Sequence, residues 1–186
     1  MATTRLSHIK GKRILAVDDE PDILETIQEI LEQAQVDMAR TYAEAVLKLK
    51  QNTYDLAVLD IMGVNGLSLL ELAVQRGIPT VMLTAHAINP DTLMASIRKG
   101  AIAYLPKETL VELDDLLDAL LEVHESGDPP WKLLFQRLGD YFDERFGPGW
   151  KDRDRAFWSE FSRSYQVGRG IQERLKHDPR LLDKGV

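Results

Sequence analysis

Several short apolar runs of the sequence end in polar side chains whose types suit phosphoryl chemistry. These side chains belong to Asp18, Asp19, Glu20, Asp60, Thr84 and Lys107. Clustered carboxylates repel one another and are costly to bury unpaired, and a hard divalent cation removes that conflict. Mg²⁺ suits a site of one or two carboxylates, water and a phosphate. An ammonium and a hydroxyl would bind phosphoryl oxygens, and a carboxylate can act as the nucleophile and form an acyl phosphate.

The apolar runs that precede these residues have the pattern of strands in a parallel sheet. Four of them are apolar at almost every position, as expected for strands that are covered on both faces. They span residues 14–17, 56–59, 80–83 and 102–105. Residues 36–39 alternate in polarity, which is typical of an edge strand. Ligands of a doubly wound sheet bind at the carboxyl ends of its strands, so the polar side chains are expected to meet in one crevice.

Amphipathic segments between these runs predict helices. Pro21 suits the first turn of a helix whose apolar face would carry Ile23, Ile27, Ile30 and Leu31. The capping-box spacing of Thr41–Glu44 opens a second helix that runs to about residue 50. Further helices are predicted over residues 67–74, 90–99 and 110–125. The order βαβαβαβαβα predicts a right-handed, doubly wound α/β domain.

The composition limits the classes of function. The 23 basic and 30 acidic residues, with a net charge of -7, argue against a protein held to nucleic acid by bulk charge. The absence of cysteine excludes disulfides, thiolate metal sites and a cysteine nucleophile. The four histidines show no metal-ligand spacing, and no apolar run approaches the ~18–20 residues of a membrane-spanning helix. We expect a globular protein without a signal peptide, located in the cytoplasm.

Four motifs carry a resemblance to a known family. They are ILAVDDE at residues 14–20, LDIM at 59–62, MLTA at 82–85 and YLPK at 104–107. In this order, over roughly residues 10 to 125, they resemble the receiver domains of two-component response regulators. The resemblance implies a CheY-like receiver domain over residues 10–126, with a flavodoxin-like, five-stranded parallel sheet in the strand order 2-1-3-4-5.

The resemblance also implies a phosphoacceptor and a set of Mg²⁺ ligands. Asp60 is the implied phosphoacceptor, and Asp19 and Asp60 are the implied direct metal ligands. Asp18 would act through a metal-bound water, and the backbone carbonyl of Met62 would complete the protein ligands.

Three further residues acquire roles in the same way. Thr84 and Lys107 would bind the phosphoryl oxygens, and Tyr104 would be an aromatic switch that turns inward after Thr84 moves. An ordinary half-buried strand tyrosine is the alternative interpretation of Tyr104. His86 could border the site and influence the lifetime of the acyl phosphate, although a solvent-facing loop histidine is the favoured interpretation.

Two positions depart from the family pattern. The loop of residues 63–66 after Asp60 is about two residues shorter than usual, which affects the metal-side carbonyl and the approach of the phosphodonor. Glu108 stands where the family usually has a proline in a cis peptide after the lysine, and a cis bond is improbable without proline. The aim of Lys107 and the start of the last helix are therefore expected to differ.

Residues 127–186 are predicted to form a helical C-terminal extension with a frayed end. Two aromatic helical faces favour a packed helical hairpin. The first carries Trp131, Leu134, Phe135, Leu138, Phe142 and Phe146, and the second Phe157, Trp158, Phe161 and Tyr165. Aromatics among arginines can also bind single-stranded nucleic acid, but the helical spacing and the alternating charges of residues 151–155 favour the hairpin. Residues 128–186 hold 12 basic and 10 acidic residues, and no helix-turn-helix is recognisable.

The leading hypothesis is a response regulator that accepts a phosphoryl group on Asp60 and signals by a conformational switch. The donor would be a histidine kinase, a phosphotransfer protein or a small phosphodonor, and the output a protein partner or self-association. The chain would not be a turnover enzyme. A DNA-binding transcriptional regulator, an aspartate-based phosphatase and a degenerate receiver without phosphorylation are the alternatives. DNA is disfavoured by the weak charge of the extension, and the phosphatase by the lack of a separate general acid beside Asp60.

Overall fold

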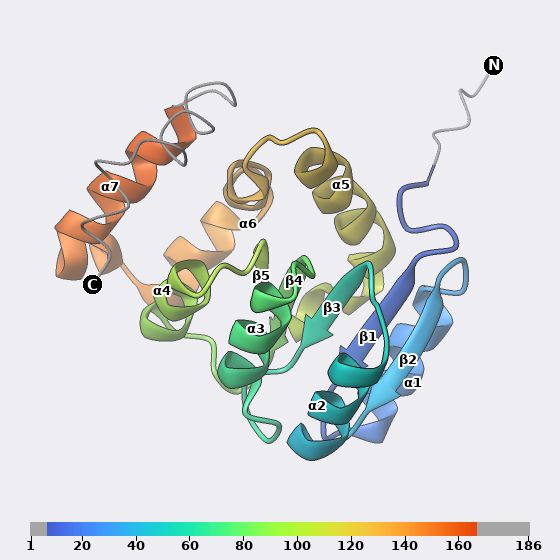
Figure 1. Cartoon of the computed structure of the whole chain (residues 1–186). Coiled ribbons are helices and arrows are strands. Elements are labelled where there is room, and N and C mark those ends of the chain that lie inside the picture. The colour runs from blue at the N-terminus through green and yellow to red at the C-terminus, as the bar shows by residue number, and fades with distance from the viewer. Residues whose placement is uncertain (1–6, 167–186) are drawn as a thin grey trace. The chain divides into compact units, whose positions relative to one another are not determined.

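A five-stranded parallel sheet forms the centre of the first of two compact units. The computed structural model describes residues 7–166, with side chains described as far as residue 163. The chain divides into the units Met1–Glu122 and Val123–Val186. The strands are β1 (Arg13–Val17), β2 (Gln35–Ala39), β3 (Leu56–Leu59), β4 (Thr80–Thr84) and β5 (Ala103–Pro106). Their order is β2-β1-β3-β4-β5, which confirms the predicted doubly wound, flavodoxin-like fold (Figure 1).

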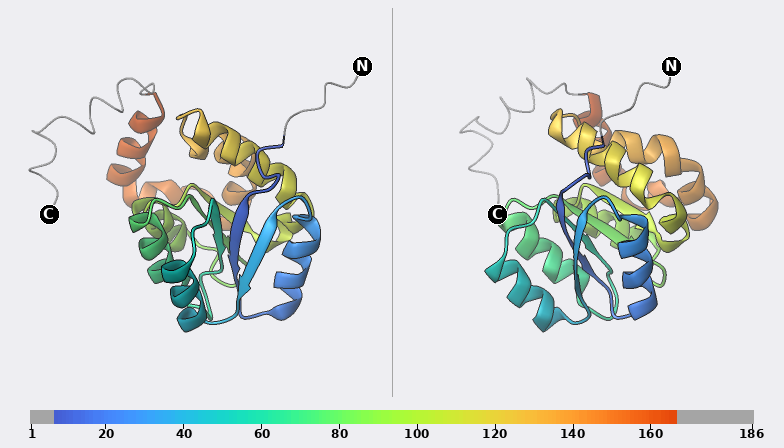
Figure 2. Two further views of the ribbon diagram at one scale, coloured as in Figure 1. Left: turned by 45° about the vertical axis from the view of Figure 1, so that its right-hand side comes forward. Right: turned by 90° about the vertical axis from the view of Figure 1, so that its right-hand side faces the viewer.

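Helices cover both faces of this sheet. They are α1 (Pro21–Ile30), α2 (Tyr42–Gln51), α3 (Gly66–Gln75), α4 (Pro90–Arg98) and α5 (Leu113–Glu125). Helices α1 and α5 lie on one face, and α2, α3 and α4 lie on the other (Figure 2). The two covered faces explain why β1, β3, β4 and β5 are buried along almost their whole length, since a sheet enclosed by helices has no solvent side.

Local sequence explains where these helices begin. The Thr41 hydroxyl accepts a hydrogen bond from the backbone N–H of Glu44 at 3.2 Å, which confirms the predicted cap of α2. Asn89 caps α4 in the same way through Thr92. The predicted apolar face of α1 was right for Ile27 and Leu31 but missed Leu24. Its buried side chains are Leu24, Ile27 and Leu31, whereas Ile23 and Ile30 are only partly buried.

The predicted last helix of the receiver unit begins later than expected. A 3₁₀ segment, η1 (Lys107–Glu112), connects β5 to α5. No cis peptide bond occurs in the described chain, in agreement with the expectation drawn from Glu108. The strand therefore continues into a tight turn before the α-helix begins.

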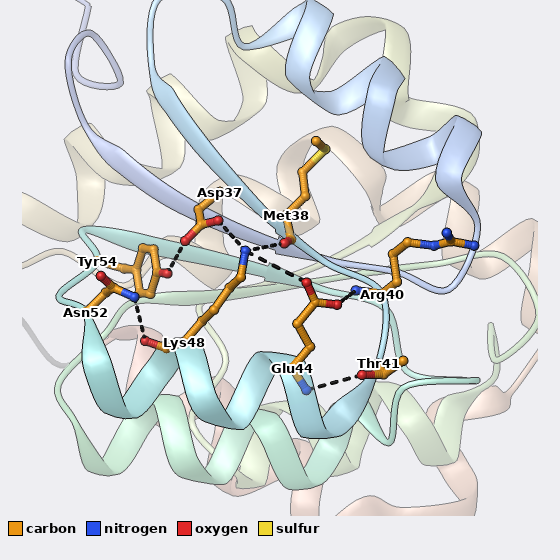
Figure 3. A network of polar contacts seen from close by, with 8 residues as sticks. All are labelled: Asp37, Met38, Arg40, Thr41, Glu44, Lys48, Asn52 and Tyr54. Atoms are coloured by element: carbon orange, nitrogen blue, oxygen red, sulfur yellow. Dashed lines mark hydrogen bonds and ion pairs between the residues drawn. The ribbon is translucent and has the colours of Figure 1, made fainter.

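A polar network fixes the edge strand β2 to α2 (Figure 3). The Lys48 ammonium donates to Asp37 Oδ1 at 2.5 Å and to the Met38 carbonyl at 2.7 Å. The Tyr54 hydroxyl donates to the other oxygen of Asp37 at 2.5 Å. Burial works against the charge of Asp37, but these two donors outweigh it and lower the pKa of the carboxyl. Asp37, the polar side chain at the middle of this edge strand, is thus satisfied by Lys48 of α2 and by Tyr54, which follows that helix.

In the described part of the second unit, which ends at residue 166, three helical segments pack through aromatic rings. They are α6 (Pro130–Phe146), the 3₁₀ segment η2 (Trp150–Asp154) and α7 (Arg155–Gln166). Phe135 of α6 makes edge contacts with Trp158 and Phe161 of α7, at centroid distances of 6.0 and 5.9 Å. The predicted aromatic faces therefore meet each other. The Tyr165 side chain and the predicted fraying of the last fifteen or so residues lie outside the described part of the chain. Among residues 7–166, no helix is both long and apolar enough to cross a membrane.

Candidate functional site

The carboxyl ends of three strands bring the predicted acids and the lysine together. Asp18 follows β1, Asp60 follows β3 and Lys107 follows β5. The register pairs Val17 with Leu59, so the next residue of each strand lies at the same edge of the sheet. The backbone N–H of Asp60 donates to the Val17 carbonyl at 2.9 Å, which fixes the position of the Asp60 backbone. Residues 42 or more apart in the sequence thus converge on one point.

The Lys107 ammonium lies among three carboxylates. Its Nζ is 2.7 Å from Asp18 Oδ2, 3.0 Å from Glu20 Oε1 and 3.4 Å from Asp60 Oδ2. The side chains of Asp18 and Asp60 are 2% and 4% exposed, and that of Lys107 is 8% exposed, whereas the Glu20 side chain is half exposed. One buried cation therefore serves two buried anions, which leaves an excess of negative charge at this site.

The electrostatics of the pair of buried acids follow from that imbalance. Burial raises the pKa of Asp18, and the nearby Lys107 only partly opposes the shift. Burial and the charge of Asp18 likewise raise the pKa of Asp60. Burial also works against the charged form of Lys107, but its hydrogen bonds to Asp18 and Glu20 outweigh this and raise its pKa. Lys107 therefore stays charged, but its single positive charge is not enough to balance the negative charges of both Asp18 and Asp60.

The acidic residues after β1 offer oxygens that suit a hard cation. One carboxylate oxygen each from Asp18, Asp19 and Glu20 lies within 4.8 Å of the others, and Asp19 and Glu20 are exposed. Oxygen ligands of this kind fit Mg²⁺, whereas nitrogen and sulfur ligands would favour other metals. The negative charge at Asp18 and Asp60 adds to this fit, because a divalent cation would neutralise it.

Thr84 supplies an unsatisfied donor at the end of β4. Its hydroxyl is buried and has no hydrogen-bond partner, although buried polar atoms are normally bonded. Thr84 pairs in register with Pro106, the residue before Lys107. An orphaned hydroxyl at a strand end that neighbours the lysine is what a site for an oxyanion would require, and we found no other such side-chain atom in the described residues.

The loop between β3 and α3 closes tightly over Asp60. The Asp60 carboxylate accepts a hydrogen bond from the backbone N–H of Ile61 at 2.8 Å. Gly66 lies so close to the Asp60 carbonyl that a β-carbon at residue 66 would overlap it. Asn65, in the left-handed region at φ 51°, turns the chain into α3. Met62 is exposed, with 54% of its surface accessible. The short loop therefore depends on the small size of Gly66.

Tyr104 is completely buried and points away from solvent. Its hydroxyl donates to the Ala87 carbonyl at 2.8 Å and lies 2.8 Å from Thr92 Oγ1. These contacts connect Tyr104 of β5 to the β4–α4 loop and to α4. His86, in that loop, is exposed as the solvent-facing interpretation expected.

Sequence reasoning missed some of these partners. Thr92 and Ala87 had no motif or periodicity that would indicate a contact with Tyr104, because the contact depends on how the β4–α4 loop folds back. Glu20 and Lys107 were expected in one crevice, but the ion pair between them was not specified. Its signal was available in principle, since Glu20 continues the acidic run after β1, at the sheet edge that receives the lysine.

Comparison with known proteins agrees with the geometry. A family model described as the response regulator receiver domain matches residues 14–121. The two-component response regulators ARR18 and ARR10 of Arabidopsis thaliana are each 34% identical, over 113 and 109 residues. These alignments cover 57% and 55% of this chain but only 18% and 20% of the relatives, so the chain spans about a fifth of their length.

Solved structures extend the comparison to the fold. A CheY-like response regulator receiver domain protein from Methanospirillum hungatei JF-1 is 30% identical, with a TM-score of 0.57. The match covers 63% of this chain and 98% of that protein. A receiver domain of the Francisella response regulator 1452 matches with 25% identity and a TM-score of 0.54, over 60% of this chain and 98% of that domain. With its strand order, its strand-end acids and a family match over more than half of its length, the chain belongs to the response regulator receiver domain family.

Proposed function

We propose that the chain is a response regulator that accepts a phosphoryl group on Asp60 in a Mg²⁺-dependent reaction and signals by a conformational switch. The observation that carries this proposal is the position of Lys107, whose ammonium lies 2.7 Å from Asp18 and 3.4 Å from Asp60 at the ends of three strands. The negative charge left over at this site favours a divalent cation, and the lysine would contact the oxygens of an incoming phosphoryl group.

The proposed reaction assigns a role to each of the converging side chains. An ionised oxygen of Asp60 attacks the phosphorus of the donor, a bond forms between them, and the leaving group departs with the electron pair of the broken bond. Lys107 binds a phosphoryl oxygen through its charge, and the Thr84 hydroxyl donates to another. Asp19, Asp60 and the backbone carbonyl of Met62 would hold Mg²⁺ directly and Asp18 would hold it through water, and the bound ion would neutralise the phosphate charge. No proton needs to leave Asp60, because the ionised carboxylate is already the nucleophile.

The proposed switch connects this site to Tyr104. The buried Thr84 hydroxyl has no partner, so a phosphoryl oxygen would draw the end of β4 toward the site. The β4–α4 loop that follows is bonded to the Tyr104 hydroxyl through the Ala87 carbonyl. Movement of Thr84 would therefore be transmitted to Tyr104 and to α4, and the surface of α4, β5 and α5 would change.

The partners and location proposed here follow from family membership. Response regulators interact with histidine kinases or phosphotransfer proteins, and one of these is the proposed phosphodonor. The output is proposed to be a protein partner or self-association in the cytoplasm, without turnover of external substrates. We propose that residues 10–126 act as the receiver domain and that the extension of residues 127–186 supplies the output or dimer surface. The aromatic packing of α6 against α7 supports a folded extension.

The decisive experiment compares wild type with Asp60→Asn in the presence of a small acyl phosphate and Mg²⁺. Intact mass should show one added phosphoryl group on wild type and none on the variant, and chelation of the metal should abolish the addition. Asp22→Asn is a matched control, since it removes an exposed charge from the first turn of α1 and should be phosphorylated as wild type is. Equal phosphorylation of Asp60→Asn, or none of wild type, would contradict the proposal.

A second experiment tests the role of the extension. Removal of residues 128–186 should leave phosphorylation intact and abolish the association that size-exclusion chromatography detects for the phosphorylated full chain. Association that persists in the shortened protein would reject the output role of the extension.

A further inference from the structure

The short loop between β3 and α3 brings Gly63 against Asp19, one of the proposed direct ligands of Mg²⁺. Gly63 adopts φ +79°, in the left-handed region that favours glycine. A β-carbon at residue 63 would lie 2.6 Å from Cγ and 2.9 Å from Oδ1 of Asp19, and closer still to Oδ2. All three atoms of the carboxylate would therefore be overlapped, so the carboxylate lies directly over the bare α-carbon of Gly63.

This contact differs in kind from that of the other glycine in the loop. A β-carbon at residue 66 would overlap the backbone of Asp60, which cannot move without displacing β3 and α3. At residue 63 the obstructed group is the end of an exposed side chain, which can rotate into solvent. A side chain at residue 63 would thus strain the backbone locally without displacing β3 or α3, and the Asp19 carboxylate would have to leave its present position.

We propose that Gly63 is a positioning residue for the metal site: the absence of a side chain at this position lets Asp19 direct its carboxylate beside Asp18 and Glu20. The inference rests on the proposed Mg²⁺-dependent function and adds a residue to it. In this short loop the Gly63 backbone approaches Asp19 closely. Glycine suits the position for two reasons, since it adopts the left-handed conformation and has no β-carbon.

The position of Asp19 matters because the other oxygens of the site are less available. Asp18 and Asp60 are buried and both contact Lys107, whereas Asp19 is exposed, and one of its carboxylate oxygens lies within 4.8 Å of oxygens of Asp18 and Glu20. Groups that orient a metal ligand typically change metal affinity by about 10- to 100-fold when they are altered. We expect a similar loss here.

The test is the affinity for Mn²⁺, used as a paramagnetic substitute for Mg²⁺ and measured by electron paramagnetic resonance on the full chain. Gly63→Ala should weaken binding about 10-fold or more. Gly77→Ala is the matched control, because Gly77 has nearly the same φ, +73°, and no atom within 4 Å of a built β-carbon. It carries the same backbone strain without the overlap, and its Mn²⁺ affinity should equal that of wild type.

A second readout separates positioning from general damage. In the metal-free protein, amide resonances of Asp19 and Glu20 should shift in Gly63→Ala and stay unchanged in Gly77→Ala. Gly63→Asn covers the case of a poorly folded alanine variant, since asparagine tolerates the left-handed region but still adds a β-carbon. Its Mn²⁺ affinity should fall as that of Gly63→Ala does.

The outcomes distinguish this inference from the proposed function. If Gly63→Ala binds Mn²⁺ as tightly as wild type does, the inference about Gly63 is overturned and the proposed function is not. The inference is also overturned if Gly63→Ala loses affinity while its Asp19 resonances stay unchanged, or if Gly77→Ala loses as much affinity as Gly63→Ala does. A wild-type protein that binds no Mn²⁺ and is not phosphorylated would overturn the proposed function and the inference together.

Discussion

Asp60→Asn is expected to stabilise the metal-free protein at neutral pH, although it removes the proposed phosphoacceptor. Asp60 and Asp18 share Lys107, and their Oδ2 atoms lie 3.4 and 2.7 Å from its Nζ. Those distances place the two oxygens at most about 6 Å apart, where unit charges repel by about 3 kcal/mol at an effective dielectric constant of about 20. The amide removes this repulsion and the cost of burying a charge.

The expected gain in the free energy of unfolding is smaller than the repulsion energy that the substitution removes. The variant also loses the attraction between Asp60 and Lys107, while Lys107 keeps Asp18 and Glu20 as partners. Burial and the charge of Asp18 hold the pKa of Asp60 above its ordinary value, so the ionised form suits the fold less well than the neutral form. We expect the free energy of unfolding to rise by about 1–2 kcal/mol, which raises Tm by about 2–8 °C in a protein of this size.

The raised pKa of Asp60 also determines how the stability difference between Asp60→Asn and wild type should change with pH. A carboxyl whose pKa is raised by folding stabilises the protein at low pH, and this contribution is lost as pH rises through the folded-state pKa. The difference between variant and wild type should therefore be largest near pH 7 and shrink as pH falls through the raised pKa of Asp60 toward 3.8, its ordinary value. Mg²⁺ should also reduce the difference, because it stabilises the folded state it binds and wild type keeps the Asp60 ligand.

Urea unfolding measures these differences. Far-UV circular dichroism reports both units, and tryptophan fluorescence reports Val123–Val186 alone, since all three tryptophans lie there. Asp22→Asn controls for the loss of one negative charge and should be within about 0.5 kcal/mol of wild type, or slightly less stable, because Asp22 lies at a helix N-terminus. A metal-free Asp60→Asn that is no more stable than wild type at pH 7, or an advantage that does not change with pH, would refute the reasoning.

Three further predictions concern single side chains. Thr84→Val removes the buried hydroxyl without a partner, so the unphosphorylated protein should keep its stability or gain about 1 kcal/mol in urea unfolding. The yield of acyl phosphate by intact mass should fall, and Thr84→Ser should restore it. Thr92→Val removes the hydroxyl that contacts Tyr104 and should cost about 1–2 kcal/mol in the same unfolding assay, whereas Thr92→Ser should cost less. Lys151→Met removes an ammonium that lies 5.2–5.4 Å from three aromatic ring centroids. It should lower the fluorescence-detected stability of the extension by about 1 kcal/mol, and the exposed Lys132→Met should not.

The sheet was predictable because burial on two faces leaves a simple pattern in the sequence. The apolar run at residues 56–59 coincides with β3, and the edge character of β2 follows from its alternating polarity. Helix faces were harder to assign. In α1, apolar side chains occur at Ile23 and Leu24 in succession, and periodicity alone does not decide which of them faces the sheet. Packing against β1 favours Leu24, which is 2% exposed.

Contacts within the site were only partly predictable, because they depend on how loops fold back. Strand ends predicted that Asp18, Asp60 and Lys107 would meet, since the register of a parallel sheet aligns those ends. The bond from Tyr104 to the Ala87 carbonyl has no such basis. It requires the β4–α4 loop to return over β5, and no local pattern encodes that path.

Glu108 departs from the family pattern at the position that follows Lys107. The residue after Lys107 was expected to change the aim of that lysine, and the chain does enter a 3₁₀ segment there. The ammonium nevertheless lies among the carboxylates of Asp18, Glu20 and Asp60. Two features upstream of residue 108 account for this. The register of β4 and β5 fixes the Cα of Pro106 opposite Thr84, and the negative charge at the sheet edge attracts the flexible side chain. The aim of the lysine is therefore set by the strand that carries it and by the charges it meets, and much less by the peptide bond that follows.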